Sequence, residues 1–153
     1  MYDAALVLHS WLRWVVLLLG FLAVARAISG RSSGTWTPAD DRVGMLFTSV
    51  LDLQMLIGLI LYFGLSPISH EGMLNMGAAM ANSSLRFWTV EHPFGMVLGI
   101  ALAHIGRSRI RKTGDGVKKH RTALIFYTLA LIVILLTIPW PGRLIGRPLF
   151  RGL

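Results

Sequence analysis

The stretch FWTVEHPFGMVLGIALAHIGRSR, from Phe87 to Arg109, decides the class of fold, because it combines an apolar run with ionisable side chains. A helix needs about 20 mostly apolar residues to cross a bilayer, and the apolar part of this stretch is long enough. The stretch also contains Glu91, His92 and His104. Because polar groups in hydrocarbon are costly and usually functional, it predicts a membrane helix that carries a site.

The composition of the chain is that of an integral membrane protein. Of the 153 residues, 54% are hydrophobic and only 14% are charged, whereas about a quarter of the residues in soluble proteins are charged. The sequence contains no cysteine, which excludes disulfides, thiol chemistry and metal sites with Cys ligands. The length fits a single transmembrane domain over residues 1–153.

Four segments are long and apolar enough to be membrane spans. They cover residues 5–27, 44–65, 87–105 and 122–140. We therefore predict an all-α fold, an up-down four-helix bundle in which the first and third spans lie diagonally. The first segment has no basic stretch before it and is interrupted by Arg13, which favours a retained helix over a cleaved signal peptide.

Polar or proline-rich segments connect and follow these spans. Residues 28–42 and 106–121 are rich in turn formers and charges, and they predict connecting loops. Residues 66–86 predict either a short interfacial helix or an ordered loop. The tail, residues 139–153, is broken by prolines and is expected to lie along the membrane surface.

The basic residues predict the orientation of the chain, because Lys and Arg accumulate on the cytoplasmic side of a membrane. The loops after the first and third spans hold ten bases: Arg26, Arg31, Arg42, Arg107, Arg109, Arg111, Lys112, Lys118, Lys119 and Arg121. The opposite side holds four: Arg86, Arg143, Arg147 and Arg151. Both termini are therefore expected on the non-cytoplasmic side of the inner (cytoplasmic) membrane. Topology thus explains the net charge of +8 without a nucleic-acid partner.

Two histidines at matching depth predict a haem site. With a rise of 1.5 Å per residue, His9 lies about 10 Å and His92 about 7 Å from the bilayer centre, both toward the outer face. An axial bis-histidine site for haem b needs two neutral imidazoles on facing helices, each with a hydrogen-bond partner for its other nitrogen. We expect His9 and His92 to be the iron ligands; the alternative is that the pair only packs.

Small residues and one arginine lie near the expected ligands. Gly95 and Gly99 share a helix face with His92, which predicts either a cleft for the flat macrocycle or close helix packing. Arg13 lies one turn deeper than the first ligand and is expected to bind a haem propionate, a carboxylate or both, because an unpaired charge in a membrane is costly. The two carboxylates within its reach are Glu91 and Asp52.

Further polar residues lie deeper in the predicted spans or toward the cytoplasm. His104 lies about 10 Å to the cytoplasmic side of the bilayer centre, and His120 lies among bases at the start of the fourth span. Together they could hold a second haem; alternatively they are polar anchors at the interface. Ser49, Asp52 and Gln54 on the second span predict an ion path or, alternatively, hydrogen bonds between helices.

The chain resembles the small four-helix membrane cytochromes b, the b561-like proteins. The resemblance rests on LHSWLRW, VEHPFGMVLGIALAHIG, KKHRTALIFY and IPWP. It implies a helical bundle that holds haem b between pairs of histidines and passes electrons between quinol and a partner. Carried over by position, His9 and His92 would be ligands of an outer haem, and His104 and His120 candidates for an inner one. Two-haem members have four well-embedded histidines, whereas only three lie inside the predicted spans here.

Three functions follow from these observations. The first is a membrane-embedded haem b electron-transfer protein, linked to quinone and working as a carrier or an oxidoreductase subunit. The alternative is a non-catalytic subunit of a respiratory or photosynthetic membrane complex, with other membrane subunits as partners. The third is a small transporter or channel built on Arg13, Asp52 and Glu91, although the sequence shows neither the internal repeats nor the broken helices of transporters.

Overall fold

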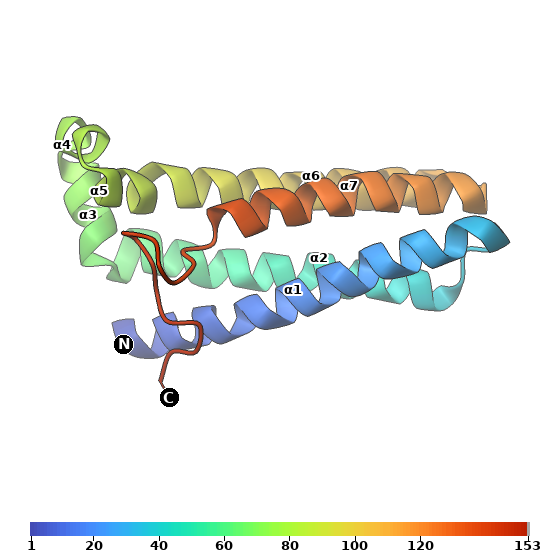
Figure 1. Cartoon of the computed structure of the whole chain (residues 1–153), viewed down its shortest axis with the longest axis horizontal. Helices are drawn as coiled ribbons and strands as arrows, with labels where there is room; N and C mark the ends of the chain where they lie inside the picture. The colour runs from blue at the N-terminus through green and yellow to red at the C-terminus, as the bar shows by residue number, and fades with distance from the viewer. Residues whose placement is uncertain (153) are drawn as a thin grey trace.

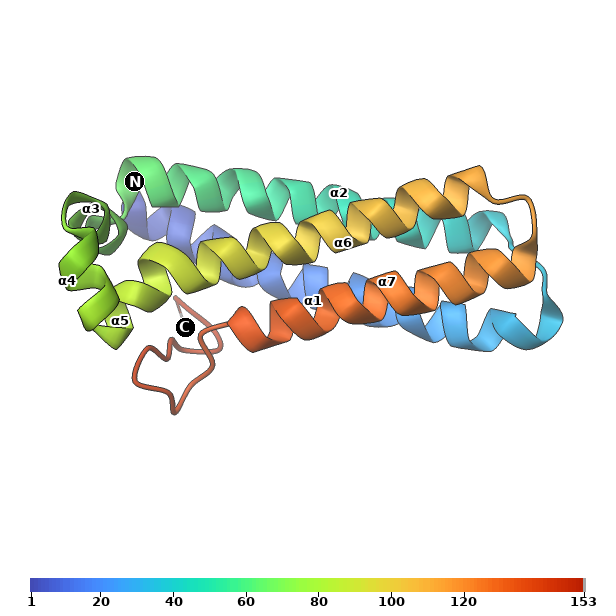
Figure 2. The ribbon, with the colours of Figure 1, turned by 90° about the horizontal axis from the view of Figure 1, so that it is seen from above.

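The computed structural model describes residues 1–152, and within them every regular element is helical. Four helices are long: α1 (Tyr2–Ser33), α2 (Pro38–Ile60), α6 (His92–Lys112) and α7 (Gly116–Thr137). They lie side by side in two layers, α1 with α2 and α6 with α7 (Figure 1). Helix α1 packs against α2 and α7, and α6 packs against α7 and α2, so α1 and α6 lie diagonally (Figure 2).

Shorter elements gather at one end of the molecule. The last turn of α2 continues as a π-helix, and the predicted interfacial segment forms three short helices before a second π-turn enters α6. These elements are η1 (Leu61–Leu65), α3 (Pro67–Leu74), α4 (Met76–Ala81), α5 (Ser83–Arg86) and η2 (Phe87–Glu91). Both chain termini lie at the same end (Figure 1). We call it the terminal end, and the opposite end, where short loops join α1 to α2 and α6 to α7, the loop end.

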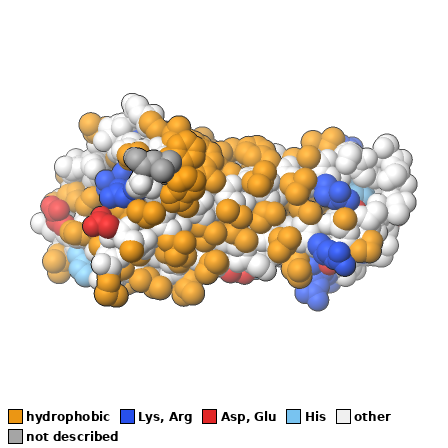
Figure 3. All heavy atoms as spheres, turned by 90° about the horizontal axis from the view of Figure 1, so that it is seen from below, with side chains coloured by type: hydrophobic (Ala, Val, Ile, Leu, Met, Phe, Trp, Pro, Cys, Tyr) orange, Lys and Arg blue, Asp and Glu red, His pale blue; other side chains and the backbone are white. Residues whose placement is uncertain are grey.

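Three of the described helices are long and apolar enough to cross a membrane, namely α1, the continuous helix from Pro38 to Leu65, and α7. The face drawn in Figure 3 shows a broad band of hydrophobic side chains, with Lys and Arg toward its ends. The predicted span over residues 87–105 is divided between η2 and α6, and bases occupy the last turns of α6. The prediction of an all-helical fold with apolar spans is thus confirmed for three of the four segments.

The loops at the loop end are shorter than the sequence predicted. Connecting loops were expected over residues 28–42 and 106–121, but only residues 34–37 and 113–115 lie outside helices. The long helices therefore extend past the apolar segments on this side, and the basic residues lie on helical turns.

Local capping explains where these helices end. Gly34 closes α1 in the left-handed region, with φ +67°, a conformation that favours glycine. Thr37 begins α2 in a capping box with Asp40, in which each side chain bonds the backbone N–H of the other residue. Asp115 begins α7 by accepting a hydrogen bond from the backbone N–H of Lys118. The polar composition predicted a loop at each of these connections, but the capping residues determine where each helix ends and therefore how long the loop is.

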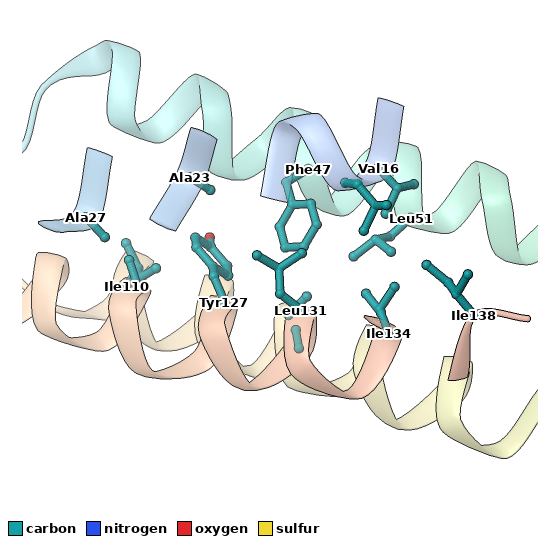
Figure 4. Close-up of a cluster of buried hydrophobic side chains, with 14 residues drawn as sticks. Val16, Ala23, Ala27, Phe47, Leu51, Ile110, Tyr127, Leu131, Ile134 and Ile138 are labelled. Atoms are coloured by element: carbon teal, nitrogen blue, oxygen red, sulfur yellow. The ribbon is translucent and has the colours of Figure 1, made fainter. Parts of the chain in front are cut away.

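A continuous hydrophobic core runs between the two layers (Figure 4). Phe47 and Tyr127 meet edge to face near its middle, with ring centroids 5.5 Å apart. Helices α1 and α7 approach closely at Gly20, where an added Cβ would lie 2.6 Å from Cδ2 of Leu131. Close packing of this kind stabilises helix pairs in a membrane, where burial from water contributes little.

The C-terminal tail packs against α1, rather than only lying along a membrane surface. The indole N–H of Trp14 donates to the carbonyl of Leu149 at 3.1 Å, and that of Trp11 donates to the carbonyl of Arg151 at 3.0 Å. The ring of Phe150 stacks on Trp14 with centroids 5.4 Å apart. The tail is therefore part of the folded terminal end.

Candidate functional site

The structure brings His9 and His92 together at the terminal end. They come from the diagonal helices α1 and α6, and their ring centroids lie 6.4 Å apart with an angle of 71° between the ring planes. Metal–nitrogen bonds are about 2 Å long, so two imidazoles on opposite sides of one metal ion have centroids about 6 Å apart. The separation is therefore compatible with two axial ligands.

A cavity of about 160 Å³ lies between the helices at this point, and both histidines line it. Leu59 and Val97 also line it and are 40% and 48% exposed, so part of its wall lies at the surface of α2 and α6. Pockets that enclose a whole drug-sized ligand measure about 300–1,000 Å³. This cavity is smaller than that range, so a ligand as large as a macrocycle would extend beyond it.

A backbone carbonyl fixes the ring of His92. Its Nδ1 lies 2.9 Å from the carbonyl oxygen of Thr137 on α7. A carbonyl only accepts, so Nδ1 must donate, and a neutral His92 then carries its lone pair on Nε2. Metal-bound histidines show the same arrangement, in which a hydrogen bond to the other nitrogen sets the tautomer and the orientation.

His9 is held differently, through its backbone and its packing. The Gln54 side chain donates to the carbonyl oxygen of His9 at 3.0 Å and so ties α2 to α1. The ring lies against Gly58, where an added Cβ would approach its Cε1 to 3.1 Å. Its Nδ1 is buried and has no hydrogen-bond partner within residues 1–152. The ring of His9 therefore lacks the hydrogen bond that fixes the ring of His92 and that metal-bound histidines normally have.

Arg13 is buried beside the cavity and contacts neither carboxylate that the sequence suggested. It is 9% exposed, its Nη2 donates to the carbonyl of Leu149 at 2.7 Å, and its buried Nε lacks a partner in the described chain. Glu91 instead pairs with Arg86 at 2.7 Å, and Asp52 pairs with His104 on the exposed side of α2 and α6. The guanidinium therefore remains available for an anionic group of a ligand.

The tail supplies a second cation to the cavity. Arg147 lines the cavity, and its guanidinium carbon lies 5.0 Å from the ring centroid of Trp88. Trp88 also lines it, with its ring centroid 5.6 Å from that of His92. One aromatic wall and two guanidiniums thus accompany the two imidazoles.

The two glycines predicted beside the haem face a helix instead. A Cβ at Gly95 would lie 2.2 Å from Cγ2 of Thr137, and one at Gly99 would lie 2.9 Å from Cγ1 of Ile134. Neither glycine is among the residues that line the cavity. Of the two interpretations of this face, the structure agrees with close packing, here of α6 on α7.

The histidines of the predicted second haem lie in separate environments. His104 is exposed, and its Nε2 lies 2.7 Å from Oδ1 of Asp52. His120 is fully buried, although the sequence placed it among solvated bases; its Nε2 donates to the carbonyl of Thr35 at 3.0 Å. Its ring also lies 4.8 Å from that of Trp36. The structure does not bring His104 and His120 together.

Three residues that shape this site were not predicted from the sequence. Thr137 acts through a backbone carbonyl, which no side-chain pattern indicates. Gly58 acts by the absence of a side chain, and Arg147 depends on how the tail folds back. Gln54 was considered, and the prediction that it bonds between helices is confirmed.

Comparisons of the chain with protein-family models, with curated proteins and with solved structures found no match. The arrangement itself offers two neutral nitrogen donors, two guanidiniums and an apolar lining. These groups could hold a metal macrocycle that carries acidic substituents. Within the described residues no three His, Asp or Glu side chains gather as a site for a bare metal ion.

Proposed function

We propose that this chain is a membrane electron carrier that binds one haem b, with His9 and His92 as its axial ligands. The observation that carries the proposal is the position of both imidazoles in one cavity, 6.4 Å apart, with the Nδ1 of His92 bonded to a carbonyl. The buried Nε of Arg13, which has no partner in the described chain, adds support, because buried polar atoms normally have partners.

The proposal places the chain in the inner (cytoplasmic) membrane as an up-down bundle of four spans, with η2 and α6 forming the third. Two features support this placement. The loop end carries the basic turns of α6 and α7, and bases favour the cytoplasm. Both termini lie at the other end (Figure 1), which would face away from the cytoplasm.

Each residue of the site then has a distinct task. His9 and His92 would hold the metal, and the carbonyl of Thr137 fixes the tautomer of His92 that leaves Nε2 free to bind it. Arg13 and Arg147 offset the charge of the propionates. A bound haem b would supply a one-electron iron couple whose potential depends on its ligands and burial. We propose a quinol in the lipid and a partner subunit as the electron donor and acceptor.

A non-catalytic subunit of a larger membrane complex is the competing function. The exposed Asp52–His104 pair favours it, because an ionisable pair on a membrane-facing surface is suited to contact another protein. In that case the cavity would remain without a metal. The two functions differ in whether the isolated chain binds haem.

The test is the absorption spectrum of the full-length chain, purified after expression with added haem. The wild type should show a Soret band with the sharp α and β bands of bis-histidine ligation. His9→Ala and His92→Ala should each abolish these bands, because each removes one ligand. The matched control His104→Ala should retain them. A folded, helical wild type without haem, or His92→Ala with the wild-type spectrum, would refute the proposal.

A further inference from the structure

An ionisable pair lies halfway along the apolar helix formed by α2 and η1. Asp52 is 14 residues after Pro38 and 13 before Leu65, the two ends of this candidate span. At 1.5 Å per residue, the carboxylate is about 20 Å from either end. Its partner, His104 on α6, bonds to it through Nε2 at 2.7 Å. The pair therefore lies near the middle of this span, whereas counting residues along the third span placed His104 about 10 Å to the cytoplasmic side of the centre.

This pair faces outward rather than into the protein. The side chains of Asp52 and His104 are 56% and 46% exposed. The bond between them is the only one that either side chain makes within residues 1–152, which leaves Oδ2 and Nδ1 without partners. Ionisable groups in hydrocarbon almost always face a bundle interior or a water-filled cavity, so the exposed pair requires another partner.

The surroundings of the pair resemble a helix-packing surface. Exposed residues on α2 recur at alternating steps of four and three, and so do those on α6. They are Met45, Ser49, Asp52 and Leu56 on α2, and Ala101, His104 and Ser108 on α6. Any lipid-facing helix shows such a stripe; the feature that sets this one apart is the polar pair at its centre. A polar group inside an apolar seam is a known device for fixing register between helices.

We propose that this surface binds a second copy of the same chain, in a parallel dimer whose two-fold axis runs along the membrane normal. The pair is self-complementary in its ion-paired form, in which both ring nitrogens of His104 donate and both oxygens of Asp52 accept, so that one N–H and one oxygen lack partners. A two-fold axis brings Asp52 of each copy to His104 of the other, because the same patch meets itself with the contacts exchanged. Four groups then satisfy one another away from lipid.

Insertion into the membrane makes a second copy of the chain available in the orientation that this contact requires. All copies of a chain insert with the same orientation, so a parallel two-fold contact is available to every copy. The proposed contact is centred on Asp52 and extends from Met45 to Leu56 along α2. The cavity wall at Leu59 lies about 10 Å further along the helix. None of the residues proposed for this contact lines the cavity, so the dimer can be tested in chains without haem.

The first experiment uses the absence of cysteine from the natural sequence. Single cysteines are introduced in the full chain at four positions around the pair and oxidised in native membranes. The positions are Ser49, Leu56, Ala101 and Ser108. At least one should give a disulfide-linked dimer, because linked Cα atoms must lie within about 7 Å. Leu18→Cys, on the exposed face of α1, is the matched control and should stay monomeric. Four positions that behave like the control would overturn the proposal.

The second experiment exchanges the two charges between copies. D52H removes the carboxylate and H104D removes the imidazole, so neither variant can pair with itself. Each should weaken dimerisation about tenfold, since each loses both hydrogen bonds that join the two copies. Differently tagged D52H and H104D chains, expressed together, should copurify more strongly than either variant does with itself. Circular dichroism of each variant checks that it remains helical.

Three results would contradict the second copy as the occupant. The first is a monomeric wild type at all protein-to-lipid ratios, and the second is a D52H variant that dimerises as well as the wild type. The third is a mixture of D52H and H104D that associates no better than either variant does with itself, while circular dichroism shows that the wild type and both variants are helical. A different membrane protein recovered in fixed stoichiometry with the wild type, and lost in D52H, would replace the second copy with that protein.

Discussion

Each end of the molecule contains a buried histidine against a glycine, but the space beside the ring differs between the two ends. At the loop end, His120 is fully buried against Trp36, and a Cβ at Gly30 would lie 2.1 Å from its ring. At the terminal end, His9 also lies against a glycine, Gly58, but it borders a cavity. Burial in a helix alone therefore does not indicate that a histidine binds a metal. His120 and His9 differ in whether a cavity lies beside the ring.

The largest expected effect compares packing in the core around Tyr127 with packing beside the cavity at the terminal end. Tyr127→Ala empties a site where the side chain is 1% exposed. In lipid the cavity cost remains although transfer from water contributes little, so we expect a loss of about 3 kcal/mol in unfolding free energy. Met96→Ala beside the existing cavity should cost less than half as much. Denaturation by SDS, followed by circular dichroism, measures both; equal losses would remove the contrast.

Two glycine substitutions compare the two histidines directly. Gly30→Ala forces a methyl group into the His120 ring, which is held by Thr35 and Trp36, so it should destabilise the chain by about 2 kcal/mol. Gly58→Ala brings its Cβ only to 3.1 Å from His9 and should cost under about 1 kcal/mol. Thermal unfolding in detergent gives both values. A larger loss for Gly58→Ala than for Gly30→Ala would contradict the difference in packing around the two histidines.

Ion pairs at the two ends should differ modestly. Arg107 at the loop end is 13% exposed and holds both oxygens of Asp41, at 2.7 and 2.9 Å. The terminal-end pair of Arg86 and Glu91 is more exposed on the arginine side and has a single bond. Asp41→Asn should therefore cost about 1 kcal/mol and Glu91→Gln about 0.3 kcal/mol, with both losses reduced by salt. Unfolding at two ionic strengths separates them.

A small effect of the opposite sign is expected for the hydroxyl of Tyr127. This group is buried and has no hydrogen-bond partner in the described chain. Removing an unsatisfied group costs nothing in hydrogen bonds, so Tyr127→Phe should change the unfolding free energy by less than about 1 kcal/mol, toward greater stability. A clear loss in the SDS titration would mean that the hydroxyl has a partner, such as a buried water.

The sequence predicted the helices better than it predicted their ends. Apolar runs indicate where a helix can cross lipid, and three of the four runs lie on helices of the required length and composition. The loop over residues 28–42 was predicted too long because polar composition does not distinguish a loop from a solvated helical turn. The left-handed Gly34 and the Thr37 cap decide that boundary.

Depth along the helices also predicted part of the site. Counting residues placed His9 and His92 at similar levels, and the structure brings their rings together. Counting does not give rotation about a helix axis, so it could not tell that Gly95 faces α7 or that His104 faces outward. Nor could it show the carbonyl of Thr137, which becomes a partner only after the helices pack.

The most direct test of the haem proposal is the number of haem b molecules per chain in the purified wild type. Chemical haem determination and amino-acid analysis of the same sample give this ratio. One cavity with one histidine pair predicts one haem per chain, and His120, which is bonded to Thr35, adds none. A ratio near zero in a folded sample, or a ratio of two, would contradict the account.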